Sequence, residues 1–103
     1  MNFDEYEKWA IEFFKERNWY QLDSSLRLNF LMEEVGELSQ AVRRYEIGRD
    51  RPDEAKRSDS ENLGLIKEEL ADVLDNVIIL MDKYDISFED MTRSHREKFE
   101  DRY

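Results

Sequence analysis

The sequence predicts an all-α protein, and two observations support this class. Only three Gly and one Pro occur among 103 residues, so few tight turns are available. Apolar residues recur at spacings of three and four along most of the chain, which is the helical period. A β-sandwich or a Rossmann domain would need more chain breakers than these. We therefore expect long helices joined by few loops, in a single domain over residues 1–103.

Four helices are expected, each with a cap or a chain breaker near an end. The first begins after Asn2 and runs to about Asn18. The others run from a Ser24 or Ser25 cap to Gly48, from about Glu61 to Tyr84, and onward from a Ser87 cap. Residues 49–60 are dense in charge and contain the only proline, so they should form an exposed loop. The two long central helices should lie antiparallel in a helical bundle.

The composition suggests a thin hydrophobic core. Hydrophobic residues make up 40% of the chain and charged residues 41%. The second helix carries a heptad-like apolar stripe of Leu28, Leu31, Val35, Leu38, Val42 and Tyr45. Small helical chains often complete such a core by pairing with a copy of themselves. We therefore expect the bundle to be completed by homo-oligomerisation.

Charge and residue usage exclude several functional classes. The net charge of −10 argues against a nucleic-acid-binding surface, where a basic footprint is expected. The absence of Cys excludes disulfides and thiolate sites, and one His excludes any site that needs two. The longest aliphatic run, residues 77–81, is too short to cross a bilayer, and no signal peptide is visible. A cytoplasmic protein without a membrane partner is expected.

Four acidic residues lie where a helical bundle would place apolar groups. At about 100° per residue, Glu34 and Glu37 fall beside the apolar stripe of the second helix. Glu69 and Asp72 interrupt the apolar arc of the third helix in the same way. Glu33 points further round, toward solvent. Each pair has the spacing i, i+3, which places both carboxylates on one helical face.

Such carboxylates need a partner, because an isolated charge in an apolar arc costs roughly several kcal/mol. An all-oxygen ligand set without His or Cys suits Mg²⁺, with Mn²⁺ as a substitute, better than Zn²⁺. The alternative is that the acids pair with Arg43, Arg44 or Lys67 at a wet interface. Composition and spacing leave both readings open.

At these residues the sequence resembles the MazG-like nucleotide pyrophosphohydrolases, members of the all-α NTP pyrophosphatase superfamily. The family signature E-E-x-x-E followed by E-x-x-D matches residues 33–37 and 69–72. Residues 13–19 (FFKERNW) and 98–102 (KFEDR) resemble its aromatic first helix and its basic tail. The resemblance implies a four-helix MazG-like bundle that assembles as a homodimer or homotetramer. It also implies Mg²⁺-dependent hydrolysis of a (d)NTP to the (d)NMP and pyrophosphate.

The resemblance also assigns roles to individual residues. It implies metal ligands at Glu34, Glu37, Glu69 and Asp72, and a catalytic or water-orienting role for Glu33. The residues expected to bind the nucleoside triphosphate are Asn76, Lys98, Arg102 and Trp19. Trp19 is a candidate for stacking on the base, or else it caps the core between the first two helices. The tail departs from the family at Glu100, where Asn is common, and the link between the two motifs is long.

Two other functions remain open at the level of sequence. Phosphoribosyl-ATP pyrophosphohydrolase belongs to the same superfamily and has related acidic helices. A non-catalytic helical dimerisation module would keep the fold without the chemistry. Pyrophosphate release from a panel of nucleotides, with and without Mg²⁺, separates these possibilities.

Overall fold

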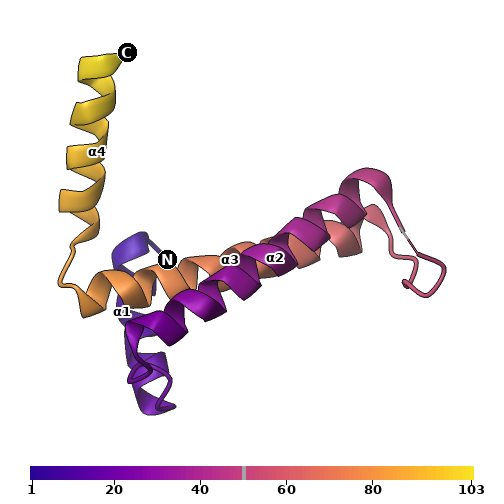
Figure 1. The fold of residues 1–103 in the computed structure, drawn as a ribbon, viewed down its shortest axis with the longest axis horizontal. Coiled ribbons are helices and arrows are strands. Elements are labelled where there is room, and N and C mark those ends of the chain that lie inside the picture. Colours follow the sequence, from indigo (N-terminus) through magenta and orange to yellow (C-terminus); the bar gives the residue numbers. More distant parts are fainter. Residues whose placement is uncertain (50) are drawn as a thin grey trace. The chain divides into compact units, whose positions relative to one another are not determined.

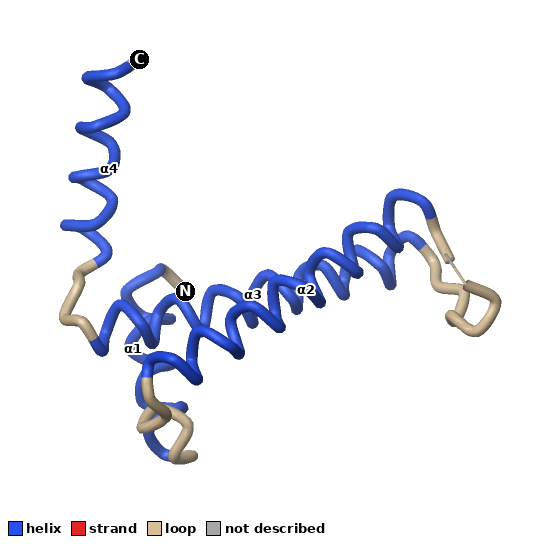
Figure 2. The backbone as a smooth tube through the Cα atoms, in the orientation of Figure 1, coloured by secondary structure: helices blue, strands red, loops and turns tan. Residues whose placement is uncertain are grey.

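A computed structural model describes residues 1–49 and 51–103; Asp50, within the expected loop, lies outside the described residues. The described residues form four helices and no strand: α1 (Phe3–Glu16), α2 (Ser24–Ile47), α3 (Asp59–Lys83) and α4 (Phe88–Arg102) (Figure 1). Figure 2 shows loops and turns in the connections between these helices and at the N-terminus. The prediction of an all-α protein with four helices is confirmed.

The first two helices begin at side-chain caps. Asn2 caps α1, as expected. Asp23, rather than Ser24 or Ser25, caps α2: its Oδ1 accepts a hydrogen bond from the backbone N–H of Leu26 at 2.9 Å. Asp, Asn and Ser are comparably good caps, so the choice depends on which residue leaves the helical backbone first.

The link between α2 and α3 is closed by a glycine and a capping box. Gly48 ends α2 with φ = +76°, a conformation that residues with a side chain rarely adopt. At the start of α3, the backbone N–H of Glu61 donates to Ser58 Oγ at 3.1 Å, and the Ser58 N–H donates to Glu61 Oε1 at 3.2 Å. These reciprocal bonds satisfy two helix-end donors, which explains why α3 begins at Asp59, two residues earlier than expected.

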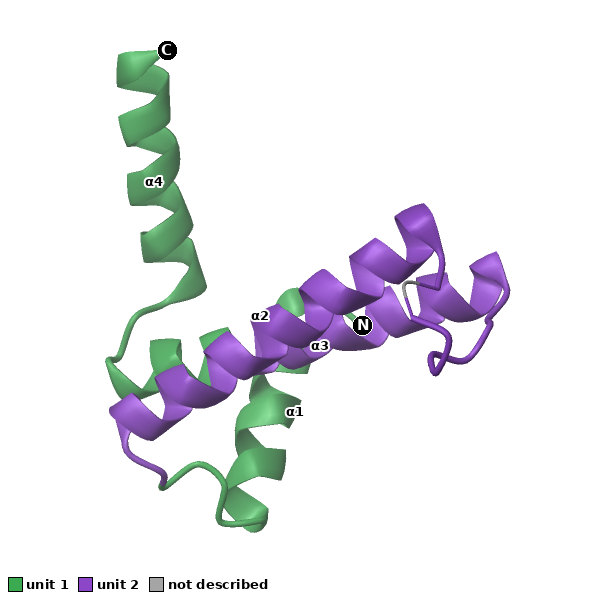
Figure 3. Ribbon diagram, turned by 45° about the vertical axis from the view of Figure 1, so that its right-hand side comes forward, with its two compact units in different colours: residues 1–21, 77–103 green, residues 22–76 purple. Residues whose placement is uncertain are grey.

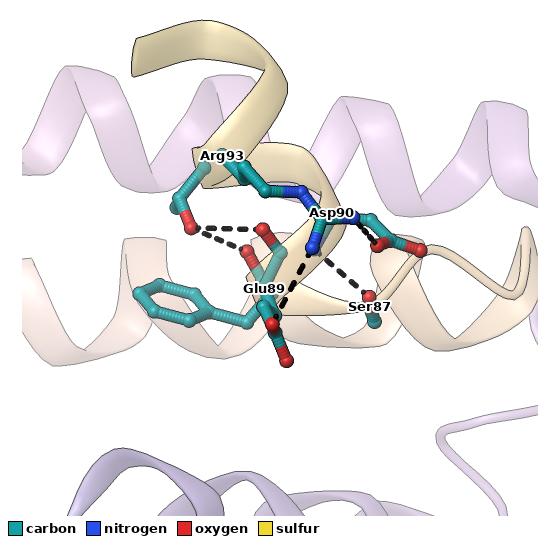
Figure 4. A network of polar contacts seen from close by, with 6 residues as sticks. Ser87, Glu89, Asp90 and Arg93 are labelled. Atoms are coloured by element: carbon teal, nitrogen blue, oxygen red, sulfur yellow. Dashed lines mark hydrogen bonds and ion pairs between the residues drawn. The ribbon is translucent and has the colours of Figure 1, made fainter. Parts of the chain in front are cut away.

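The start of α4 is held by a small polar network, drawn in Figure 4. Ser87 Oγ accepts a hydrogen bond from the backbone N–H of Asp90 at 3.1 Å, which confirms the expected cap. Arg93 forms ion pairs with Asp90 at 2.8 Å and with Glu89 at 3.5 Å (Figure 4). The acidic residues also lie in the first turn, where the helix dipole favours negative charge.

The helices divide into two compact units, coloured separately in Figure 3. Unit 1 contains residues 1–21 and 77–103, and α3 runs across the boundary at residue 77. Within unit 1, Ala10, Ile78, Ile79 and Met81 are buried. The Tyr20 hydroxyl donates a hydrogen bond to Asp82 at 2.7 Å, which raises the pKa of Tyr20 to about 12. These contacts tie the loop after α1 to the end of α3.

Unit 2 contains residues 22–76, and in it α2 and the first part of α3 lie side by side and antiparallel (Figures 1 and 3). This confirms the expected relation of the two central helices. The apolar stripe of α2 is only partly covered within the single chain, because Leu28, Val35 and Val42 are exposed. One neighbouring helix covers only part of the face, and the exposed residues recur at every seventh position. Among the described residues, no helix has the length and apolar character needed to cross a membrane.

Candidate metal centre

Three carboxylates converge between the antiparallel helices of unit 2. Glu34 and Glu37 lie one turn apart on α2, and Glu69 reaches them from α3. Each offers one oxygen, and these three oxygens all lie within 4.8 Å of one another. The i, i+3 spacing on α2 therefore places the pair as the sequence predicts, and the antiparallel register brings Glu69 opposite.

The electrostatics of this cluster disfavour full ionisation. The pKa of Glu34 is raised to about 7, first because burial removes water from its carboxylate. Repulsion from Glu37, Asp72 and Glu69 adds to this effect, and so does a hydrogen bond with Glu37. A carboxylate surrounded by others prefers to keep its proton unless a cation is present.

Glu69 and Asp72 on α3 also have raised pKa values. Burial raises the pKa of Glu69, followed by repulsion from Glu37. Burial also raises the pKa of Asp72, followed by repulsion from Glu68 and Glu37, while a hydrogen bond with Glu34 opposes the rise. Asp72 is therefore part of the same electrostatic cluster, although its oxygen lies outside the group of three that converge most closely.

The basic neighbours named by the sequence do not neutralise these acids. Arg43 instead donates to Glu54 at 3.1 Å. Within residues 1–49 and 51–103, none of the four acids forms an ion pair with a basic side chain. One oxygen each of Glu34 and Glu69 is buried and has no hydrogen-bond partner in that part of the chain. The reading in which these acids are structural ion pairs is not supported.

This donor set fits a hard divalent cation. Its close oxygens are all carboxylate. Glu34 and Glu69 each also have one buried oxygen without a partner among the described residues, which is costly unless a cation compensates. Mg²⁺ binds through a few carboxylates and keeps positions for water and substrate phosphates. Glu34, Glu37 and Glu69 could hold such a cation, and the role of Asp72 as a fourth ligand stays a prediction.

A buried arginine flanks the cluster and was missed by the sequence analysis. Arg27 is only 4% exposed, and its Nη1 donates to the side-chain oxygen of Asn76, also buried, at 3.0 Å. The Asn76 amide donates in turn to the backbone carbonyl of Asp72 at 2.9 Å. Burial lowers the pKa of Arg27. The signal in the sequence was its position, seven residues before Glu34 and hence on nearly the same helical face.

The remaining predicted site residues are not among the three converging carboxylates. Glu33 is exposed on α2, as expected. Trp19 belongs to unit 1, where its ring meets that of Phe14 edge-on with centroids 5.6 Å apart. Lys98 and Arg102 are exposed on α4, also in unit 1. Their roles in substrate binding stay predictions.

Comparison with known proteins identifies the family. The model of the MazG nucleotide pyrophosphohydrolase domain matches residues 23–103. The chain belongs to the MazG family. It is 48% identical over 97 residues to the uncharacterized protein YvdC of Bacillus subtilis (strain 168), a match that covers 94% of this chain and 92% of that protein. No solved structure matches the chain. Membership of the MazG family indicates nucleotide pyrophosphohydrolase chemistry in general and confirms the resemblance seen in the acidic motifs.

Proposed function

We propose that the chain is a Mg²⁺-dependent nucleoside triphosphate pyrophosphohydrolase, which converts a (d)NTP to the (d)NMP and pyrophosphate. The observation that carries the proposal is the convergence of Glu34, Glu37 and Glu69 oxygens within 4.8 Å, without a basic partner among the described residues. Membership of the MazG family supports the same chemistry.

The acidic residues have different proposed roles in the reaction. Glu34, Glu37, Glu69 and Asp72 would hold Mg²⁺, with Mn²⁺ as a substitute. The cation would supply charge neutralisation for the phosphates and a polarised environment for water. No protein nucleophile is needed, since phosphoanhydride hydrolysis depends chiefly on positioning and on charge stabilisation. Glu33, exposed beside the cluster, is the residue we assign to orienting the attacking water.

Four further residues are proposed to bind the nucleotide. Lys98 and Arg102 carry positive charge on an exposed helix and suit phosphate oxygens. Trp19 is about half exposed and offers a face for stacking. Asn76 is bonded on both sides to Arg27 and Asp72, so its contribution would be to fix the backbone that carries a metal ligand.

The test is pyrophosphate release from a panel of nucleoside triphosphates, with phosphoribosyl-ATP included, in the presence and absence of Mg²⁺. Asp72→Asn keeps the shape of the side chain and removes its charge, so we expect release to fall by orders of magnitude, equivalent to about several kcal/mol. Glu46→Gln, an equal change at an exposed position of α2, is the matched control. Release from no member of the panel would favour a non-catalytic dimerisation module.

We also propose a homodimer or homotetramer. The support is the exposed row of Leu28, Val35 and Val42 on α2, together with Leu63 and Leu70 on α3. Leu70 is 52% exposed although it lies beside the acidic cluster in sequence. Apolar rows at seven-residue spacing are the pattern that helices bury against other helices. A second copy of the chain is the partner that would complete the core.

A further inference from the structure

A basic pocket lies at the end of α2, two helical turns beyond the carboxylate cluster. It is a cavity of about 250 Å³ within unit 2. Its lining combines Arg44 and Asn62, from α2 and α3, with three cationic side chains of the connecting segment: Arg49, Lys56 and Arg57. Four positive charges thus surround one cavity in a chain whose net charge is −10.

The two described acids of the same segment, Asp53 and Glu54, pair with arginines outside the pocket. Glu54 accepts a hydrogen bond from Arg43, and Arg51 pairs with Asp53 at 3.4 Å and with Glu54 at 3.8 Å. Glu61 closes the capping box of α3. Among the described residues, none of the four cationic side chains of the pocket forms an ion pair. The pocket therefore keeps its positive charge uncompensated within that part of the chain.

One polar atom of the pocket is buried without a partner among the described residues. The Arg44 Nε is buried and makes no hydrogen bond to any described residue. Asn62 is 7% exposed, and its side-chain amide likewise makes no hydrogen bond within residues 1–49 and 51–103. Buried polar groups are normally satisfied, so the buried Arg44 Nε, beside an asparagine in a cationic cavity, indicates a polar ligand.

The opposite end of the cluster gives an internal comparison. Arg27 precedes Glu34 by seven residues and bonds directly to the buried Asn76. Arg44 follows Glu37 by seven residues, at a rise of about 10 Å along the helix, and faces a pocket that also contains a buried asparagine. Arg27 and Asn76 bond to each other, whereas Arg44 and Asn62 share a cavity and make no such bond within residues 1–49 and 51–103.

We propose that this pocket binds a phosphate-type oxyanion, for which inorganic pyrophosphate is the simplest probe. Guanidinium groups present paired donors that match phosphate oxygens, and the amide of Asn62 adds a further donor. The carboxylate cluster repels an anion when no metal is bound, so the two sites can be distinguished in one protein.

The test is calorimetric titration of the full chain with pyrophosphate after divalent metal has been removed on a chelating resin. We expect saturable binding by the wild type and affinity at least about tenfold weaker in Arg57→Gln, an exposed position that should not affect folding. Arg44→Gln tests the buried guanidinium. Arg51→Gln is the matched control, since it lies in the same segment and pairs with acids outside the pocket.

Absence of pyrophosphate binding by the metal-free wild type would overturn the proposal. Equal weakening by Arg57→Gln and Arg51→Gln would also overturn it, because a diffuse positive field would then explain the binding. This arm measures no hydrolysis, so its result is independent of the proposed enzyme activity.

A second arm identifies where the oxyanion comes from. With Mg²⁺ and nucleotide present, a raised KM in Arg57→Gln would show that the pocket holds the polyphosphate of the substrate. An unchanged KM, with pyrophosphate binding lost, would show that the pocket takes a separate phosphate compound. Both results support an oxyanion site at this position.

Discussion

Replacing Glu34 by Gln tests the electrostatic account of the carboxylate cluster most directly. The side chain is half-buried, and its pKa is raised to about 7 by burial and by the repulsion of its neighbours. The folded, metal-free protein therefore favours the neutral form of this carboxyl. Gln has nearly the same shape and is always neutral, so it should stabilise the metal-free fold wherever Glu34 would be ionised.

The sign and size of the contribution that Glu34 makes to the free energy of unfolding follow from its pKa in the folded protein, compared with the ordinary value of 4.5. Because the folded pKa is the higher one, the stabilising contribution of the bound proton is complete below pH 4.5. It is lost as the pH rises through about 7. The shift corresponds to roughly 3 kcal/mol, and solvent screening reduces the expected loss to about 2 kcal/mol. For a chain of this size that loss lowers Tm by roughly 10 °C.

The assay is thermal denaturation of wild type and Glu34→Gln at pH 5 and pH 8.5, at one protein concentration. In EDTA the two proteins should have similar Tm at pH 5, and the variant should melt higher at pH 8.5. Millimolar Mg²⁺ should then raise the Tm of the wild type and change that of the variant little, because one ligand is missing. Glu46→Gln controls for the general effect of removing a negative charge from α2.

The reasoning would be refuted by parallel pH profiles of wild type and Glu34→Gln in EDTA. It would be refuted equally by a variant that melts lower at pH 8.5, since that result means Glu34 makes a favourable contact as an anion. An identical Mg²⁺ response in both proteins would remove Glu34 from the ligand set.

Three other substitutions separate catalysis, stability and assembly. Glu33→Gln should leave the Mg²⁺-induced rise in Tm intact and lower kcat for pyrophosphate release, as expected of a residue that orients water. Arg27→Leu should lower the free energy of unfolding in urea by about 2 kcal/mol, because it leaves the buried oxygen of Asn76 unpaired. Val42→Glu should reduce the mass of the assembly measured by light scattering, because it places a charge in the exposed apolar row of α2. A wild-type protein that is already monomeric at micromolar concentration would contradict the assembly proposal.

The helices were predictable from the sequence because their signals are local. The Asn2 and Ser87 caps act over three residues, and the structure has both. The start of α2 was displaced to Asp23 because neighbouring residues are comparably good caps, and local chemistry does not rank them. Periodicity identified the apolar row of α2 but not what covers it, so the exposure of Val35 and Val42 could not be predicted.

The candidate site was predictable only in part, for a different reason. The spacing of Glu34 and Glu37 on one helix fixes their common face. Their approach to Glu69 depends on the register of α2 against α3, which is set by the length and closure of the intervening segment. The burial of Arg27 also depends on that register, because its partner, Asn76, is 49 residues away in sequence. Contacts of this kind leave no periodic signal.

The register of α2 against α3 brings the carboxylates together, and a cationic side chain lies on each side of them along α2. Arg27 lies seven residues before Glu34, and Arg44 lies seven residues after Glu37. Each cation is therefore two turns from the acidic cluster on nearly the same face, one on each side of it. An acidic chain that acts on a polyanion needs positive charge near its site, and a bound divalent cation supplies only part of it. The closed Arg27–Asn76 pair stabilises one end of the cluster, while the basic pocket at Arg44 keeps its charge accessible at the other. The net charge of −10 is therefore compatible with a phosphate-bearing ligand, because cationic side chains gather in a pocket two turns from the acids along α2.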